Sequence, residues 1–315
     1  MNMHFCCLAR GGLSTMNKLV KNYRQNPLLY WMLAPVLLYV LIFNYVPMFG
    51  LVISFQDYSL TRGVLGSKWI GLKNFEDFFS SMYFGRTLGN TLILSGLDLL
   101  VCFPAPIILA LMLNEVSHLR FKKVIQTVSY MPHFISMVVV AGLIKEFCSS
   151  TGVVAQFVQL LGGTPQSYIS QPQYFRAIFT VSQVWQTIGF NSIVFLAALS
   201  GIDMQLYEAA KIDGAGRLRQ LWHVTLPGII PTIIIMLILR CGAIMNVNFE
   251  KVLLLYSPST YATADVISTY VYRAGIIKQK IGYSTAVGLF NSVVSLMLVL
   301  GANYLSNKFT DSGLF

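Results

Sequence analysis

The chain has 315 residues, of which 55% are hydrophobic and only 11% are charged. A water-soluble domain of this length needs a polar exterior, which 22 basic and 12 acidic residues cannot supply. The net charge of +10 is spread over short loops and does not form a basic stripe with interleaved aromatic residues, so it gives no reason to expect nucleic acid as a partner. The composition therefore indicates one polytopic membrane domain.

Six apolar segments are long enough to cross a bilayer. Each exceeds the roughly 20 residues that about 30 Å of hydrocarbon requires at 1.5 Å per residue. Long continuous segments favour helices over the short alternating strands of a barrel. The predicted spans are Leu28–Phe55, Thr87–Leu113, Val124–Phe147, Arg176–Leu199, Ile229–Phe249 and Ser284–Ser306. We predict an all-α membrane protein: an extension over residues 1–27, a transmembrane domain over 28–307 and a tail over 308–315.

The loops indicate how the helices are oriented. An even number of spans puts both termini on one side, and basic residues in the short loop Asn114–Lys123 favour the cytoplasm for that side. Met1–Thr15 does not have the pattern of a secretory signal, and Met16 is an alternative start. We therefore expect N-in and C-in topology in the cytoplasmic membrane, with the long segments Gln56–Arg86 and Cys148–Phe175 outside.

Prolines lie within or beside several spans, which predicts kinks or breaks because proline removes a helical hydrogen bond. They are Pro35, Pro47, Pro104, Pro106, Pro132 and Pro231. Kinked helices suit a transport pathway better than a plain membrane anchor.

The loop between the fourth and fifth spans, at 200–228, predicts two short helices joined by a glycine turn. Asp203 is placed to cap the first helix, and Gly214 can supply the left-handed residue that ends it. The small apolar residues between them suit a compact plug that enters a groove of another protein.

This loop resembles the EAA motif of binding-protein-dependent ABC importer permeases. The matching residues are Glu208-Ala209-Ala210, then Gly214, then Val224–Pro227. The resemblance implies that the loop docks into a cleft of the ATP-binding subunit, where Glu208 can pair with a basic residue. The residues that it assigns to ATPase coupling are Glu208, Ala209, Ala210, Asp213, Gly214, Leu226 and Pro227.

The chain from Asn17 onward also looks like the LplB-type branch of carbohydrate permeases. The stretches that carry this resemblance are Asn44–Phe55, Gly66–Phe75, Ser129–Ser136 and Asn246–Tyr256. It implies the six-helix type I importer fold of the MetI and MalF kind and a substrate that is an oligosaccharide or polysaccharide fragment, acidic ones included. The implied partners are a second homologous permease subunit, two ATP-binding subunits and an extracytoplasmic solute-binding protein.

The sequence has no glycine-rich loop ending in Gly-Lys-Ser or Gly-Lys-Thr that could hold ATP phosphates. We therefore expect no cofactor and no enzymatic activity on this chain, with ATP and Mg²⁺ bound by a partner ATPase.

Polar and aromatic residues inside the fourth and fifth spans are candidates for the substrate path, because such groups are costly in lipid unless they face a cavity. Gln183, Gln186 and Phe190 share one helical face. Resemblance to maltose-type members implies that these two spans hold the sugar; the alternative is that the amides only bond neighbouring helices. The candidates are Gln183, Trp185, Gln186, Phe190, Asn191, Arg240, Asn246 and Asn248.

Arg240 lies within a predicted span, where an uncompensated arginine costs on the order of 3 kcal/mol or more. Asp98, at comparable depth in the second span, is one candidate partner. An anionic group of the substrate is a second, and snorkelling toward the membrane edge is a third possibility. For His133, which follows Pro132, helix packing is favoured over a role in the pathway.

The motifs together predict a permease that works by alternating access and is driven by a separate ATPase. An ion-coupled secondary sugar transporter would also show broken helices and polar residues near the midplane, and it is the alternative. A membrane enzyme would need paired carboxylates or a metal site, and the sequence shows neither pattern.

Overall fold

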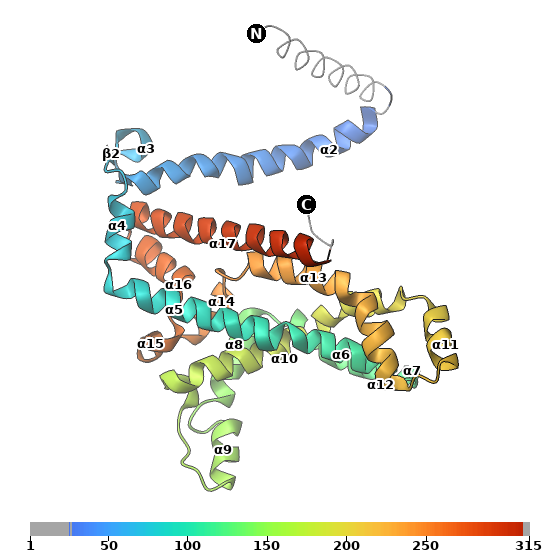
Figure 1. The fold of residues 1–315 in the computed structure, drawn as a ribbon. Helices are drawn as coiled ribbons and strands as arrows, with labels where there is room; N and C mark the ends of the chain where they lie inside the picture. Colours follow the sequence, from blue (N-terminus) through green and yellow to red (C-terminus); the bar gives the residue numbers. More distant parts are fainter. Residues whose placement is uncertain (1–24, 26, 311–315) are drawn as a thin grey trace.

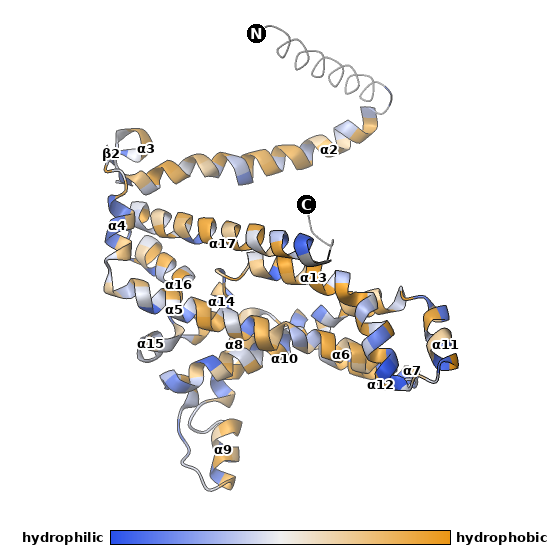
Figure 2. Ribbon diagram, in the orientation of Figure 1, coloured by the Kyte–Doolittle hydropathy of each residue, from blue (hydrophilic) through white to orange (hydrophobic). Residues whose placement is uncertain are grey.

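The computed structural model describes residue 25 and residues 27–310, and over them the chain is a bundle of long helices (Figure 1). Four of the described helices are long and apolar enough to cross a membrane, and two bent helix pairs bring the number to six if each pair is one span. These correspond to the six predicted spans. Figure 2 shows apolar residues along α2, α6 and α17 and hydrophilic ones at α11 and α12. The predicted extension and tail lie almost wholly outside the described residues.

The first span stands apart from the bundle. It runs through α2 (Pro27–Val40), a π-helical turn at Leu41–Tyr45 and a 3-10 helix at Val46–Phe55. None of its most apolar 18-residue stretch is buried, and only the 3-10 segment packs closely on α17 (Ile281–Thr310). Its apolar surface is therefore free to meet lipid or another subunit.

A small cap follows the first span. The short strands β1 (Gln56–Asp57) and β2 (Lys68–Trp69) pair antiparallel around α3 (Gly63–Gly66) and lead into α4 (Lys73–Phe79). Asn74 ties α4 to the end of the first span and to β1, because its Nδ2 donates to the carbonyl oxygens of Ser54 (2.9 Å) and Gln56 (3.1 Å).

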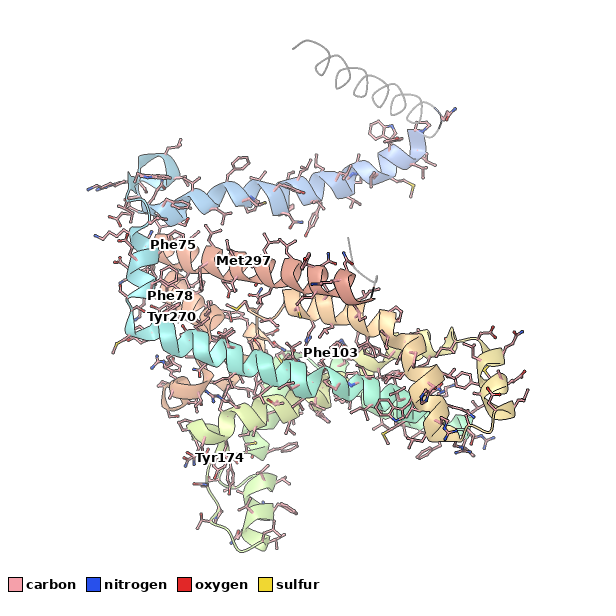
Figure 3. All side chains as sticks on the ribbon, viewed as in Figure 1. Phe75, Phe78, Phe103, Tyr174, Tyr270 and Met297 are labelled. Atoms are coloured by element: carbon pink, nitrogen blue, oxygen red, sulfur yellow. The ribbon has the colours of Figure 1, made fainter. Side chains whose placement is uncertain are left out.

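Phe78 of α4 is fully buried in a cluster of aromatic rings from α5, α16 and α17. Figure 3 shows Phe75, Phe78 and Tyr270 gathered beside α4 at this end of the bundle. The cap is thus part of the folded bundle and is held by aromatic packing.

The second span consists of α5 (Met82–Leu97), a π-helical turn at Asp98–Cys102 and α6 (Pro104–Glu115). It packs along α10 (Pro172–Ser200), the fourth span. Both helices extend several residues beyond their predicted ends, because polar residues at the boundaries continue the helix outside the apolar segment.

The third span is broken, as its proline predicts. α7 (Leu119–Tyr130) passes through a 3-10 turn at Met131–Phe134 into α8 (Met137–Phe147), and the two parts meet at 100°. Pro132 has no N–H to continue the ladder, and Ser136 caps α8 by accepting from the Val139 N–H. α9 (Val153–Leu160) then lies in the loop before α10.

The fifth span differs from the prediction at both ends. The predicted second short helix of the loop is α12 (Arg217–Gln220), and it continues through a π-helical turn at Leu221–Thr225 into α13 (Leu226–Gly242). Pro227 does not interrupt it, because the π-helical turn directly before it changes the hydrogen-bond pattern at the point where proline lacks an N–H.

The helix ends at Gly242, seven residues before the predicted end at Phe249, and Asn246 and Asn248 therefore lie in the connection that follows. Asn248 caps α14 (Phe249–Leu255) by accepting from the Lys251 N–H. Asparagine favours such capping over a helix interior, which explains why the span stops early. α15 (Tyr261–Ala264), α16 (Ile267–Tyr272) and a π-helical turn at Arg273–Ile277 lead into α17.

Candidate functional site

A polar cavity of about 180 Å³ lies inside the bundle, between α5, α10 and the end of α13. Four of the predicted path residues line it: Gln183, Arg240, Asn246 and Asn248. Asn248 Nδ2 donates to Gln183 Oε1 at 3.4 Å, so the fourth span is bonded to the connection that follows the fifth. We call this space the central cavity.

Arg240 is paired with Asp98 on the wall of the central cavity. Its Nε and Nη2 donate to the two carboxylate oxygens, which is the bidentate geometry that arginine and carboxylate prefer. The side chains keep 33% and 21% of their surface exposed, so the pair borders the cavity and is not sealed in the core. Of the three alternatives for Arg240, the structure contains the intramolecular pair.

Lys251, at the start of α14, is a second cation beside the central cavity and was missed by the sequence analysis. Its side chain is completely buried. Nζ donates to Gln183 Oε1 (3.2 Å) and Gln186 Oε1 (3.4 Å) and lies 5.6 Å from the centre of the Phe179 ring. None of the ion pairs among the described residues includes Lys251. Two amide oxygens compensate a buried ammonium only partly, so this charge favours an anion nearby.

The other predicted path residues of α10 separate into two groups. Gln186 is buried and takes part in the Lys251 contacts. Trp185 faces a different, almost wholly apolar cavity between α8 and α10, because two residues along a helix correspond to a turn of about 200° from Gln183. Phe190 stacks on His133 with ring centres 3.9 Å apart, which makes that histidine a packing residue as predicted. Trp185, Phe190 and Asn191 do not line the central cavity, and their assignment to the substrate path stays a prediction.

The coupling segment has the predicted local structure. In α11 (Met204–Ile212) Asp203 accepts a capping hydrogen bond from the Gln205 N–H at 2.9 Å. Gly214 ends the helix with a φ of 75°, and the Ala215 N–H donates to the Ala210 carbonyl oxygen at 2.9 Å.

The surface of α11 is free over the described part of the chain. No residue of the helix is buried, and Ile212 keeps 87% of its surface. Glu208 and Ala209 are exposed, as are Asp213 and Gly214 in the turn, whereas Leu226 packs against the cluster around Phe195 at the base of α13. Of the residues predicted to couple to the ATPase, those of α11 and its turn are therefore exposed, whereas Leu226 packs inside the bundle.

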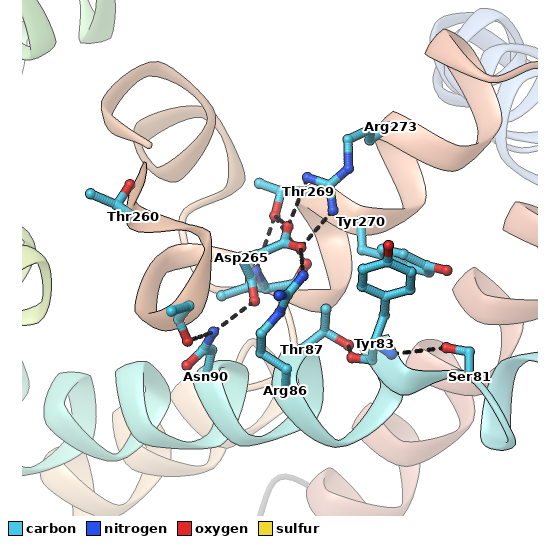
Figure 4. A network of polar contacts seen from close by, with 12 residues as sticks. Ser81, Tyr83, Arg86, Thr87, Asn90, Thr260, Asp265, Thr269, Tyr270 and Arg273 are labelled. Carbon is cyan, nitrogen blue, oxygen red and sulfur yellow. Dashed lines mark hydrogen bonds and ion pairs between the residues drawn. The ribbon is translucent and has the colours of Figure 1, made fainter. Parts of the chain in front are cut away.

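A buried polar network joins α5 to the segment around α16 (Figure 4), and Arg176 of α10 reaches it through Asn90. In Figure 1, α16 and α11 lie toward opposite ends of the bundle. Asp265 has no exposed surface, and Arg273 donates to both of its carboxylate oxygens. Asn90 Nδ2 donates to the Asp265 carbonyl oxygen, while Asn90 Oδ1 accepts from Arg176 at 2.9 Å. Burial opposes the charge of Arg273, but the hydrogen bonds and charge of Asp265 raise its pKa above the ordinary arginine value. This network fixes the outer ends of three helices.

These features define a class of protein: a membrane-spanning transport subunit with a polar cavity between its helices and an exposed element for docking to another chain. Residues 78–311 match the family described as the binding-protein-dependent transport system inner membrane component, and the chain belongs to it. It is the permease subunit of an ABC importer. Because the chain belongs to this family, the alternative of an ion-coupled secondary sugar transporter is not supported.

Relatives of known name agree with this membership. Protein LplB of Bacillus subtilis (strain 168) is 47% identical, with 93% of this chain and 92% of that protein covered. The polygalacturonan/rhamnogalacturonan transport system permease protein YteP of the same strain is 44% identical over 92% and 91%. A crystal structure of a bacterial ABC transporter involved in import of the acidic polysaccharide alginate contains a chain with a TM-score of 0.87 and 46% identity, covering 93% and 99%. The predicted type I importer fold is confirmed.

Proposed function

We propose that this permease moves an oligosaccharide or polysaccharide fragment, including acidic ones, across the cytoplasmic membrane by alternating access. Two relatives support the substrate class: one is named for polygalacturonan and rhamnogalacturonan transport, and the other imports alginate. All three of these glycans contain uronic acids, so a carboxylate is the chemical feature that they share.

The observation that carries the proposal is the charge at the central cavity. Arg240 is neutralised by Asp98, whereas Lys251 contacts only amide oxygens and an aromatic face among the described residues. Lys251 therefore adds, behind Gln183 on the cavity wall, a basic group that no carboxylate among the described residues balances, and the amides of Gln183 and Asn248 on that wall can bond sugar hydroxyl groups. Such a site favours an anionic sugar over a neutral one.

ATP is hydrolysed on two separate ATP-binding subunits, which hold ATP and Mg²⁺, and their closure moves α11. The exposed helix with Glu208 at its middle supports this coupling. The α11 end lies opposite α4 in Figure 1, which fits N-in and C-in topology with α11 in the cytoplasm. The unburied α2 supports a second homologous permease as a lateral partner. The segments around α4 and α9 then face an extracytoplasmic solute-binding protein, the kind of partner that the alginate importer has in one of its crystal structures.

The test is uptake by the complete complex, with its partner permease, ATPase and binding protein, in liposomes. Oligogalacturonate, alginate oligosaccharide and a neutral malto-oligosaccharide are offered with ATP inside. We expect ATP-dependent uptake of at least one acidic oligosaccharide in preference to the neutral one. Failure to transport any oligosaccharide, or uptake driven by an ion gradient without ATP, would contradict the proposal.

A further inference from the structure

A second, larger cavity adjoins the central cavity. It has a volume of about 540 Å³ and lies between α14, α16 and the first half of α17. Asn246 lines both cavities, and its Oδ1 accepts from Asn291 Nδ2 of α17 at 2.9 Å. We call this space the α17 groove. No predicted path residue other than Asn246 lines it.

The sizes of the two cavities differ in a way that matters for a long substrate. Cavities that hold a drug-sized ligand measure about 300–1,000 Å³. The central cavity, at about 180 Å³, falls below that range, and the α17 groove lies within it. An oligosaccharide that enters the central cavity therefore needs further space for its remaining rings.

Two residues that line the α17 groove carry buried polar atoms without a partner among the described residues, and these atoms reach a ligand in the groove only if the side chains rotate toward it. Asn291 is buried, and its Oδ1 accepts no hydrogen bond; Ser268 Oγ is likewise buried and unpaired. A buried polar atom without a partner costs about 1–3 kcal/mol, so these atoms favour a ligand or water that can bond them. A sugar hydroxyl can donate to the amide oxygen and accept from the serine.

Aromatic rings and a glycine complete the groove. Phe249 and Tyr272 lie with ring centres 5.7 Å apart on its wall, and flat apolar rings of this kind can stack on the C–H face of a pyranose. A Cβ added at Gly288 would meet no atom within 4 Å, so the α17 backbone is open to the groove there. The groove thus combines aromatic faces, free hydrogen-bonding atoms and open backbone.

We propose that the α17 groove is the second compartment of the sugar path, which holds the rings of an oligosaccharide that extend beyond the central cavity. The inference rests on the proposed function and adds a site to it. The groove runs from Asn246 toward Ile276 and the start of α17, away from α11 (Figure 1). With α11 in the cytoplasm, the groove is the outer part of the path.

The first test asks whether the groove contains water and sugar in the assembled complex. All five native cysteines are replaced, and a single cysteine is introduced as Gly288→Cys or, as a control, as Val181→Cys at the apolar cavity between α8 and α10. A charged thiol reagent needs a hydrated thiolate. We expect it to label position 288 and not 181, and we expect a saturating transported oligosaccharide to slow the labelling. The inference would be overturned if position 288 were not labelled, which is expected for a groove covered by lipid or by the partner permease. It would also be overturned if the transported sugar did not change the labelling rate.

The second test separates this inference from the proposed function by substrate length. Gly288→Leu fills the groove, and Gly301→Leu is the matched control, because Gly301 is equally unobstructed but lies about 20 Å further along α17. We expect Gly288→Leu to lower uptake of an alginate pentasaccharide about tenfold relative to the disaccharide, with assembly and basal ATP hydrolysis unchanged. Tyr272→Ala should do the same and Tyr272→Phe should not. If Gly288→Leu lowered uptake of the pentasaccharide and the disaccharide equally, or lowered neither, the groove would not be part of the sugar path. The proposed function would still hold in that case, because it is judged from uptake by the wild-type complex.

Discussion

The central cavity and the exposed helix α11 differ in where the groups that interact with their polar side chains lie. At the cavity, polar groups satisfy one another: Asp98 pairs with Arg240, and Lys251 is held by the amides of Gln183 and Gln186. On α11, no residue is buried and no described residue pairs with Glu208.

The difference indicates two kinds of sensitivity. Changes at the cavity act on the stability and selectivity of this chain, because its polar groups depend on each other. Changes on α11 leave the fold intact and act only in the assembled importer, because the groups that α11 must meet belong to another subunit.

The largest effect is expected at α11 and its turn. Glu208→Lys reverses the charge that pairs with the ATPase, and Gly214→Val forces a β-branched residue to a φ of 75°. We expect either variant to abolish uptake and substrate-stimulated ATP hydrolysis while the chain still inserts in the membrane, with thermal stability unchanged in Glu208→Lys and lowered locally by backbone strain in Gly214→Val. Glu76→Lys, at an exposed position of α4, is the control. Normal stimulation of ATP hydrolysis by substrate in the Glu208→Lys complex would show that α11 does not couple this chain to the ATPase.

The second prediction concerns the placement of α11 and the cap on opposite sides of the membrane. Lys73→Cys and Gln166→Cys, in a background without native cysteines, should react with an impermeant reagent from outside, and Lys211→Cys on α11 should react only from the cytoplasm. Labelling in intact and opened cells measures this. The reverse pattern would overturn the proposed orientation.

A smaller effect is expected at the ion pair. Asp98→Asn leaves Arg240 beside the cavity without its counter-charge, which we expect to cost about 2–3 kcal/mol, less than a fully buried pair because both side chains are partly exposed. Asp98→Leu combined with Arg240→Met should recover much of the loss. Thermal unfolding of the purified complex measures both. An Asp98→Asn complex with wild-type stability would show that substrate or water compensates Arg240.

The smallest effect is expected at Lys251. Lys251→Met removes this basic group but keeps the volume, so we expect the complex to assemble and uptake of an acidic oligosaccharide to fall about tenfold, or about 1.4 kcal/mol, relative to a neutral one. Lys251→Arg should retain the preference in part. Competition between the two sugars measures the ratio, and an unchanged ratio in Lys251→Met would exclude Lys251 from charge selection.

Local signals predicted much of the fold. Long apolar segments located all six spans, Pro132 located the break of the third, and the coupling motif located α11 with its Asp203 cap and Gly214 turn. These features depend on neighbours within a few residues, so they can be recognised from short stretches of sequence.

The candidate site was only partly predictable, because its contacts join distant parts of the chain. Asp98 lies 142 residues from Arg240, and Gln183 lies 68 from Lys251. The Asp98 partner could be named because both residues are rare charges in apolar spans. Lys251 was overlooked because it follows a helix end that apolar content alone did not locate. Polarity also does not tell which face of α10 meets the central cavity, and Trp185 lies at a different cavity.

The fourth span has a mechanical consequence. α10 is one uninterrupted helix of 29 residues, about 43 Å long, with Arg176 in the outer polar network, Gln183 at the cavity and its last residue one loop away from α11. A Cβ at Gly189 would lie 2.2 Å from the Ser129 carbonyl oxygen, so α7 is pressed against this rod and must move with it. A tilt of α10 at the end next to α11 would therefore displace Gln183 at the central cavity and Arg176 in the polar network together, because one stiff helix carries both.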